Sequence, residues 1–233
     1  MARSSLVSII IPTYNERENI KVLIPRIFSV LKNAEIIVVD DNSPDGTADT
    51  VRQLGKTRRV KLIQRPKKLG IGSAYKDGFR QAKGDVVFEM DADLSHDPSS
   101  LPDFVRALQT SDVVVGSRYI PGGRIEGWGI YRKAVSMIAN MLARKLLQLR
   151  VHDVTSGFRA YRRSALRVFG KKEIRSDGYS FQLEVLYRMV SDGCSVREIP
   201  IVFRDRIIGK SKLGKIKEVV NYLLTVARLA AGR

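Results

Sequence analysis

The strongest constraint on the fold is a regular alternation of short apolar runs with helical segments over the first half of the chain. Five apolar runs rich in β-branched residues predict buried strands at 7–12, 35–39, 60–64, 85–90 and 112–116. Helical periodicity predicts helices between them, at 17–31, 47–54, 71–82 and 99–109. Strands that alternate with helices at this spacing are typical of a parallel, doubly wound sheet. The sequence therefore predicts an α/β fold, with a mostly parallel central sheet flanked by helices.

The alternation stops at Ser117, and the rest of the chain has a different pattern. Loops are expected at 121–127 and 152–160. Helices are predicted at 132–149, 179–191 and 213–231, and a strand at 195–203. The chain contains no internal repeat and no low-complexity tract, so we expect one domain over 1–233, whose character changes at about residue 116.

The chain is strongly basic, and the excess of positive charge lies mainly in its second half. Lys and Arg number 41 against 24 Asp and Glu, which gives a formal net charge of +17. Between residues 132 and 175 the only acidic residues are Asp153 and Glu173. A field of this sign attracts nucleic acid, an anionic membrane surface or phosphate-bearing substrates. A generally solvated basic surface is the alternative.

Cysteine content and hydropathy indicate the compartment. Cys194 is the single cysteine, so an intrachain disulfide is impossible and a cysteine-based metal cluster is not expected. No uninterrupted apolar run reaches the roughly 18 residues of a membrane span. The first residues lack the architecture of a signal peptide. We therefore expect a cytoplasmic protein with no transmembrane segment in this chain.

Polar clusters follow four of the predicted strands at the point where each strand ends. They are residues 12–16, 40–41, 91–93 and 117–118. In open parallel α/β sheets, ligands bind outside the carboxyl ends of the strands. Because a single polar cluster is no more than an ordinary turn, it is the four together that favour an active site at this edge.

Two familiar nucleotide-binding motifs are absent. The turn after the first strand is not the glycine-rich turn of a dinucleotide site, and no Walker A sequence occurs in the chain. Two glycines, Gly70 and Gly72, lie at the start of a predicted helix. They are only a weak indication of a phosphate-binding site, because an ordinary helix start explains them equally well.

Asp91 and Asp93 are the best candidates for metal ligands. Their spacing lets both side chains point the same way from an extended segment, where two carboxylates repel each other unless a cation joins them. Carboxylate oxygens suit Mg²⁺ or Mn²⁺, and Mg²⁺ is often held by one or two carboxylates and substrate phosphates. In the alternative, one aspartate caps the next turn and the other is solvated. His96 and His152 do not form a metal pair, and we expect them to be solvated or to cap turns.

An ordered set of motifs resembles a known family over essentially the whole chain. The set comprises IIIPTYNE at 9–16, VVDDNSPDGT at 38–47, MDADLSHDP at 90–98, GSRYIPGG at 116–123, TSGFRAY at 155–161, IPIVFR at 199–204 and GKSK at 209–212. These motifs resemble family 2 inverting glycosyltransferases of the GT-A fold, and among them the dolichol-phosphate (polyprenol-phosphate) mannose synthases. The resemblance implies a GT-A, Rossmann-like domain that takes mannose from GDP-mannose.

The resemblance also assigns roles to residues. The donor would lie against Pro12, Tyr14, Glu16, Val39, Asp41, Asp91, Ala92, Asp93, Arg204 and Lys210. Asp91 and Asp93 would hold Mg²⁺ or Mn²⁺, with Asp93 and Arg118 as the catalytic pair. Ser95 stands where family members often have glutamine, and this shorter side chain would reach a metal through water.

For the acceptor, the resemblance implies a polyprenyl or dolichyl monophosphate. Arg118, Arg132 and Lys133 would receive its phosphate. Residues up to about 116 would then form the nucleotide-sugar half, and the rest the half facing the acceptor and membrane. Peripheral attachment to the cytoplasmic face is implied, possibly through a separate small membrane subunit. The helix at 132–149 would lie at the membrane surface or pack as an ordinary amphipathic helix.

Two alternatives stay open. A UDP-glucose or other UDP-sugar donor would suit the same lipid acceptor, because base and sugar selectivity depend on few side chains. A basic nucleic-acid-binding module belongs to a different class, which only the charge suggests. The chain has no helix-turn-helix, aromatic RNP or zinc-finger signature, so no nucleic-acid partner is expected.

Overall fold

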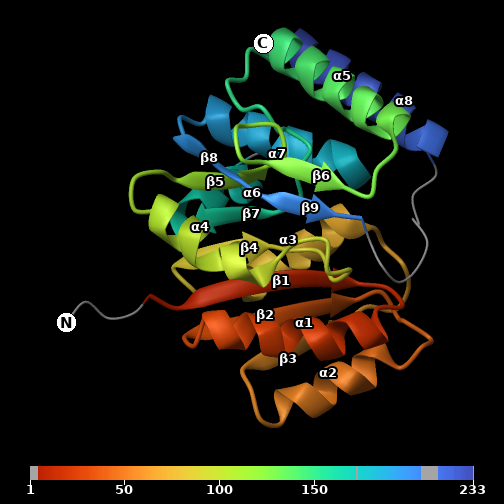
Figure 1. Cartoon of the computed structure of the whole chain (residues 1–233), viewed down its shortest axis with the longest axis vertical. Coiled ribbons are helices and arrows are strands. Elements are labelled where there is room, and N and C mark those ends of the chain that lie inside the picture. Colours follow the sequence, from red (N-terminus) through yellow and green to blue (C-terminus); the bar gives the residue numbers. More distant parts are fainter. Residues whose placement is uncertain (1–4, 172, 206–214, 233) are drawn as a thin grey trace.

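A seven-stranded sheet forms the centre of the structure and confirms the predicted α/β class with a mostly parallel sheet (Figure 1). The computed structural model describes residues 5–171, 173–205 and 215–232. The strand order is β3-β2-β1-β4-β7-β5-β8. The strands are β1 (Val7–Thr13), β2 (Ala34–Asp40), β3 (Val60–Gln64), β4 (Val86–Glu89), β5 (Val113–Ser117), β7 (Arg159–Arg162) and β8 (Val196–Pro200).

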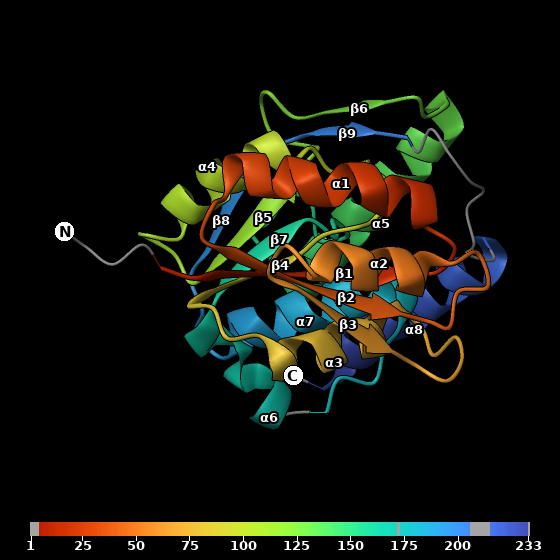
Figure 2. The same ribbon diagram turned by 90° about the horizontal axis from the view of Figure 1, so that it is seen from below.

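Helices cover both faces of this sheet. They are α1 (Arg17–Val30), α2 (Thr47–Gly55), α3 (Ile71–Gln81), α4 (Leu101–Ala107), α5 (Ile130–Leu147), α6 (Val168–Lys171), α7 (Gly178–Ser191) and α8 (Lys215–Ala231). Two 3₁₀ turns, Pro98–Ser100 and Arg163–Arg167, precede α4 and α6. Seen from below, α1 and α4 lie on one side of the sheet and α3 and α7 on the other (Figure 2). The sheet therefore separates two apolar cores.

Strand β1 shows why the first apolar run could be recognised. It lies between β2 and β4 and is parallel to both. Ile9 and Ile11 enter one core and Ile10 enters the other, and all three are fully buried. A strand covered on both faces needs apolar side chains in both directions, which produces a continuous apolar run rather than an alternating one.

Strand β7 was missed, and the predicted loop over 152–160 is wrong at its end. The strand lies between β4 and β5 and is antiparallel to both. Its sequence contains two arginines, which does not resemble a buried strand. Arg159 is nevertheless completely buried, because backbone carbonyl oxygens accept its guanidinium hydrogens.

Two further predictions from the second half are corrected. Strand β6 (Arg124–Glu126) lies inside the predicted loop over 121–127. The predicted strand at 195–203 is two strands, β8 and β9 (Val202–Arg204), which belong to different sheets. Ile201 separates them and packs into the core, while β9 leaves the main sheet and pairs with β6. This small sheet holds Arg204 in place.

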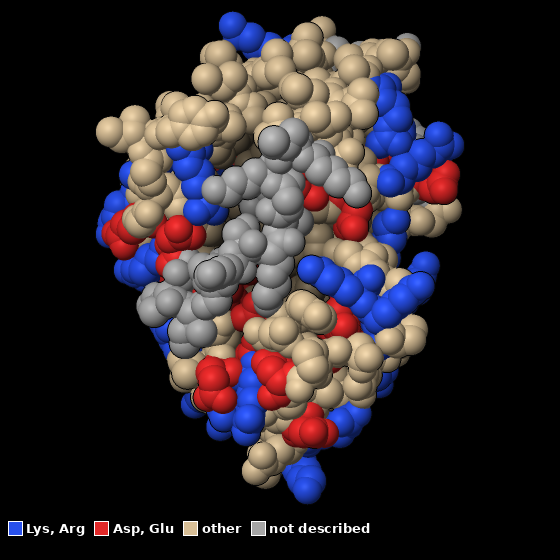
Figure 3. All heavy atoms as spheres, turned by 90° about the vertical axis from the view of Figure 1, so that its right-hand side faces the viewer, with Lys and Arg blue, Asp and Glu red and all other residues tan. Residues whose placement is uncertain are grey.

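Helices α5 and α8 lie together at the top of the molecule (Figure 1), where residues without charge form most of the surface seen in Figure 3. The Tyr222 hydroxyl joins them by donating to the Ala139 carbonyl oxygen at 3.1 Å. The exposed apolar residues include Met137, Ile138, Met141 and Leu146 on α5 and Val219, Val220, Leu223 and Leu224 on α8. Only part of α5 packs as a core helix, through Ala143 and Leu147. None of the helices in the described ranges is both long and apolar enough to cross a membrane.

Gly78 sets the distance between α3 and β1. A Cβ atom at this position would lie 2.2 Å from Cγ2 of the fully buried Ile10. We expect Gly78→Ala to lower the free energy of unfolding by about 1–3 kcal/mol, because the helix must move off the strand. Urea denaturation measures the loss. Gly170→Ala in α6 is the control, since nothing lies within 4 Å of its added Cβ, and an equal loss in both variants would contradict the close approach.

Candidate active site

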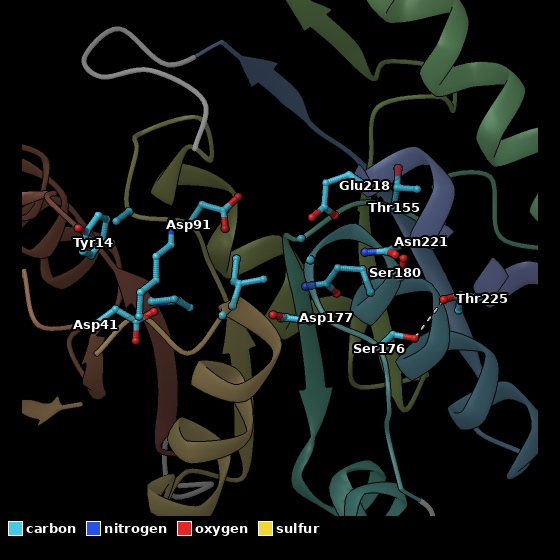
Figure 4. A pocket seen from close by; sticks show the side chains of 18 of the residues that line it. Tyr14, Asp41, Asp91, Thr155, Ser176, Asp177, Ser180, Glu218, Asn221 and Thr225 are labelled. Atoms are coloured by element: carbon cyan, nitrogen blue, oxygen red, sulfur yellow. Dashed lines mark hydrogen bonds between the residues drawn. The ribbon is translucent and has the colours of Figure 1, made fainter. Parts of the chain in front are cut away.

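A cavity of about 800 Å³ opens at the carboxyl ends of the parallel strands. Residues that follow β1, β2 and β4 form one side, and the start of α7 and one face of α8 form the other (Figure 4). Seven residues assigned from the sequence line it, namely Pro12, Tyr14, Glu16, Asp41, Asp91, Ala92 and Asp93. The strand-end clusters at 12–16, 40–41 and 91–93 therefore meet at one cavity.

The β1 side of the cavity presents an aromatic ring beside a cation. Lys68 Nζ lies 4.9 Å from the centre of the Tyr14 ring, and both residues line the cavity. The segment after β1 is fixed by the start of α2, because the Glu16 amide donates to Thr47 Oγ1 at 3.1 Å. This side can therefore offer a flat stacking surface and a positive charge to a nucleotide.

Asp41 lies deeper in the same wall and is paired with Arg65. The Arg65 guanidinium binds the Asp41 carboxylate, and both side chains are almost completely buried. Arg65 also donates to the Gly70 carbonyl oxygen at 2.9 Å. Burial raises the pKa of Asp41 above its ordinary value, although Arg65 acts in the opposite direction. The pair thus places a carboxylate acceptor at the back of the cavity and ties it to the start of α3.

Asp91 and Asp93 both reach the cavity just beyond β4. The Asp91 side chain is one-third exposed, and its Oδ1 lies 3.4 Å from the Tyr75 hydroxyl. Oδ1 of Asp93 accepts from the Ser95 amide at 3.1 Å, which fixes the turn after the strand. Two carboxylates that open onto one cavity match the oxygen ligands of Mg²⁺ or Mn²⁺. Among the described residues, no group of three or more acidic, His or Cys side chains lies together in a way that could hold a metal ion.

Buried ionisable groups lie directly beneath the aspartates. His96 is 2% exposed, so of the two expected roles the solvated one is wrong, while the capping one agrees with its bond to a backbone amide. Its Nδ1 accepts from the Asp91 amide at 3.2 Å, its ring stacks on Phe158, and burial lowers its pKa. Burial raises the pKa of Glu89 to about 7 against the opposing effect of Arg159. A neutral histidine therefore supports the backbone of Asp91.

The opposite wall joins segments far apart in the sequence. The Gly72 amide at the start of α3 donates to Asp177 Oδ1 at 2.7 Å. This carboxylate occupies the helix N-terminus that the Gly70 and Gly72 pair marked as a weak phosphate signal. Arg228 on α8 binds the buried Glu184 at 2.7 Å. Helix α8 thereby closes the cavity and brings a second set of polar groups to face Asp91.

Other predicted site residues do not line the cavity as far as the structure describes the chain. Val39 is buried in a core, and Ser95 is buried with its hydroxyl turned away from any partner. Arg204 pairs with Glu126 at 3.2 Å and with Asp97 at 3.5 Å. Lys133 is half-buried in the first turn of α5. Lys210 lies outside the described residues.

Arg118 and Arg132 meet at one aromatic ring. The guanidinium carbon of Arg132 lies 3.9 Å from the centre of the Trp128 ring, and that of Arg118 lies 5.6 Å away. Arg118 is held by two charge-assisted hydrogen bonds of 2.7 Å to the buried Asp153. The structure thus brings together two of the three cations assigned to the acceptor phosphate, beside rather than in the cavity.

Several cavity residues were missed by sequence reasoning. They are Lys68, Arg175, Ser176, Asp177, Ser180, Gln182, Asn221 and Arg228. A usable signal existed at 175–182, where a polar run surrounds a glycine just before a helix. The residues of α8 gave no such signal, because a single polar side chain on a helix face is normally solvated.

Comparison with known proteins matches this geometry. The family model described as glycosyl transferase family 2 matches residues 8–170. The chain is 41% identical over 211 residues to the polyprenol monophosphomannose synthase of Mycolicibacterium smegmatis, covering 88% of this chain and 80% of the relative. It is 40% identical over 208 residues to the undecaprenyl-phosphate mannosyltransferase of Micrococcus luteus, covering 88% and 86%.

Solved structures support the fold. A mannosyltransferase from Pyrobaculum calidifontis, in complex with GDP-Man and Mn²⁺, has a TM-score of 0.66 at 19% identity and covers 97% of this chain and 65% of that chain. Glucosyl-3-phosphoglycerate synthase from Mycobacterium tuberculosis has a TM-score of 0.74 at 19% identity and covers 97% and 79%. Both confirm the expected GT-A architecture. With a family model over most of its length and close relatives of the same kind, the chain belongs to glycosyl transferase family 2.

Proposed function

We propose that the protein transfers mannose from GDP-mannose to a polyprenyl monophosphate, inverting the anomeric centre and requiring a divalent cation. The observation that carries the proposal is the Asp91 and Asp93 pair at the edge of a cavity that extends from Tyr14 to α8. The names of the two relatives supply the sugar and the class of acceptor. The Pyrobaculum structure was solved with GDP-Man and Mn²⁺, which supports the choice of donor and metal.

The donor would lie along the strand-end wall. Tyr14 offers a ring on which a base can stack, and Asp41 offers carboxylate oxygens to base or ribose donors. Asp91 and Asp93 would hold Mg²⁺ or Mn²⁺ against the diphosphate, and the bound cation would stabilise the negative charge of the leaving phosphate. Lys68 brings a second positive charge to this wall. Arg204 and Lys210 stay predictions as donor contacts.

The acceptor would approach from the wall formed by α7 and α8. A phosphate monoester is already an anionic nucleophile near neutral pH, so this reaction does not require a general base. Arg175 and Arg228 line that side of the cavity, where Arg175 pairs with Glu173 and Arg228 with Glu184. Contacts of the phosphate with Arg118, Arg132 and Lys133 stay predictions. The guanidinium groups of Arg118 and Arg132 both lie over the Trp128 ring. These side chains are the candidates for receiving the anionic head of the lipid.

The exposed apolar faces of α5 and α8 support peripheral attachment to a membrane. A helix with an exposed apolar face and basic flanks can lie in the plane of a bilayer. Both helices border the acceptor side, and Leu224 of α8 both lines the cavity and is exposed. The membrane face and a small membrane subunit stay predictions.

A product assay tests the proposal. Purified protein is mixed with detergent-solubilised polyprenyl phosphate, Mg²⁺ or Mn²⁺, and either GDP-mannose or UDP-glucose. We expect release of GDP and formation of a mannosyl lipid, both dependent on metal and on acceptor, and both abolished by EDTA. Release of UDP without release of GDP would show that the enzyme uses UDP-glucose rather than GDP-mannose as its donor. Release of neither would overturn the proposal.

A further inference from the structure

Two polar side chains at the start of α7 face the cavity without using all their hydrogen-bonding capacity. Ser180 and Gln182 both line the cavity, and they are only 1% and 5% exposed. Ser180 Oγ and Gln182 Oε1 have no hydrogen-bond partner among the described residues. A buried polar atom without a partner costs free energy, so such atoms at a cavity wall indicate a ligand that supplies the partner.

Both groups lie across the cavity from the proposed metal ligands. Figure 4 shows Ser180 on the side opposite Asp91. Gly157 also lines the cavity, and the point where a Cβ would stand on it lies 3.7 Å from Asp91 Oδ2 and 3.8 Å from Gln182 Nε2. No side chain separates the carboxylate from the amide at this point. Both groups therefore line the same part of the cavity, next to Gly157.

A buried arginine holds this arrangement rigid. The Arg159 guanidinium donates to the carbonyl oxygens of Val154 and Ser156 at 2.8 Å and of Gln182 at 2.6 Å. It thereby joins the segment before Gly157 to the first turns of α7. Arg159 is a positioning residue, which fixes where the Gln182 amide stands relative to Asp91.

The chemistry of the two groups favours a sugar over a phosphate. An amide and a hydroxyl are neutral and can each donate and accept, as sugar hydroxyls do. Asp91 and Glu89 lie close by, and carboxylates disfavour a second anion. If Asp91 and Asp93 bind the diphosphate through a cation, the sugar joined to that diphosphate must lie within reach of the Gln182 amide.

We propose that Gln182 and Ser180 bind hydroxyl groups of the sugar that is transferred, and so determine which sugar the enzyme accepts. This inference rests on the proposed function, because it assumes a sugar nucleotide held at Asp91 and Asp93. Substrate hydroxyls supply the partners that the two side chains lack. A donor without the matching hydroxyl is discriminated against, because the buried amide then stays unpaired.

Binding measurements separate sugar recognition from catalysis. The affinities of the wild type, Gln182→Met and Ser180→Ala for GDP and for GDP-mannose are compared by calorimetry with Mn²⁺. We expect both variants to bind GDP as the wild type does. Gln182→Met should bind GDP-mannose about 10- to 100-fold more weakly, and Ser180→Ala about 3- to 10-fold. Gln53→Ala, an exposed position on α2, should change neither affinity.

Deoxy donors identify the contact. Wild-type kcat/KM is measured with GDP-mannose and with its 2-, 3-, 4- and 6-deoxy forms. For one deoxy donor, the loss of kcat/KM seen in the wild type should be absent in Gln182→Met, because that variant already lacks the side chain that binds the missing hydroxyl. Equal losses in wild type and variant for every donor would overturn the inference, even with mannosyl transfer intact. If the wild type transferred no mannose at all, the proposed function itself would fail. Ser180→Ala gives the same comparison should Gln182→Met not fold.

Discussion

Replacing Asp93 with alanine is expected to lower kcat for sugar transfer by about 1000-fold while leaving the fold intact. Asp93 lines the cavity just beyond β4, and its Oδ1 accepts from the Ser95 amide at 3.1 Å. Removing one of two nearby carboxylates relieves repulsion in the metal-free protein, whereas losing the hydrogen bond to the Ser95 amide costs about 1 kcal/mol. The melting temperature of the metal-free variant should therefore change by only a few degrees.

Thermal shift in the presence of Mn²⁺ and GDP provides the second measurement. Ligands that bind only the folded state raise its stability in proportion to the logarithm of their concentration. We expect the metal-dependent part of this shift to vanish in Asp93→Ala and in Asp91→Ala. Asp103→Ala is the matched control, because Asp103 is an exposed aspartate paired with Arg106 on α4. Normal turnover in Asp93→Ala would show that the acidic pair is structural.

The first half of the fold could be predicted because its signals are local. Ile9, Ile10 and Ile11 belong to a strand covered on both faces, so their burial produces a continuous apolar run that can be recognised in the sequence. Asp91 and Asp93 were recognisable because two carboxylates one residue apart, directly after an apolar run, suggest a bound cation. Each signal lies within a few residues of the element it specifies.

The second half was harder because its contacts are distant in sequence. Strand β7 carries Arg159 in a fully buried position, and only the carbonyl groups of Val154, Ser156 and Gln182 make that possible. The wall opposite Asp91 has the same origin, as the contact between Asp177 and Gly72 spans 105 residues. No local pattern encodes a pairing of this kind.

For Arg118, the sequence motif indicated a functional residue but did not reveal the side chain with which it pairs. The sequence suggested a phosphate ligand, and the structure shows an ion pair with Asp153, whose side chain is 0% exposed. Burial alone would raise the pKa of Asp153, but the Arg118 charge and hydrogen bonds hold it below its ordinary value. Asp153 is therefore an ionised aspartate inside the protein, and its ion pair with Arg118 holds that arginine beside Trp128.

Asp153→Ala should lower the free energy of unfolding by about 3–5 kcal/mol, because it leaves Arg118 buried without its counter-ion. For a chain of this size that corresponds to a fall in Tm of roughly 10 °C. Asp49→Ala is the control, since Asp49 forms a 2.7 Å ion pair with Arg52 at an exposed site. An exposed pair contributes about 0.5 kcal/mol, so similar losses in both variants would contradict the buried pair.

The pH dependence of stability gives the same pair an independent test. A carboxyl group whose pKa is depressed in the folded state stabilises the protein at pH values above its unfolded pKa. That contribution is lost as the pH falls through the depressed folded value, below the ordinary aspartate range. The stability difference between wild type and Asp153→Ala should therefore be complete near neutral pH and shrink in acid. A difference that stayed constant down to strongly acidic pH would mean that packing at Asp153, rather than its charge, holds Arg118 in place.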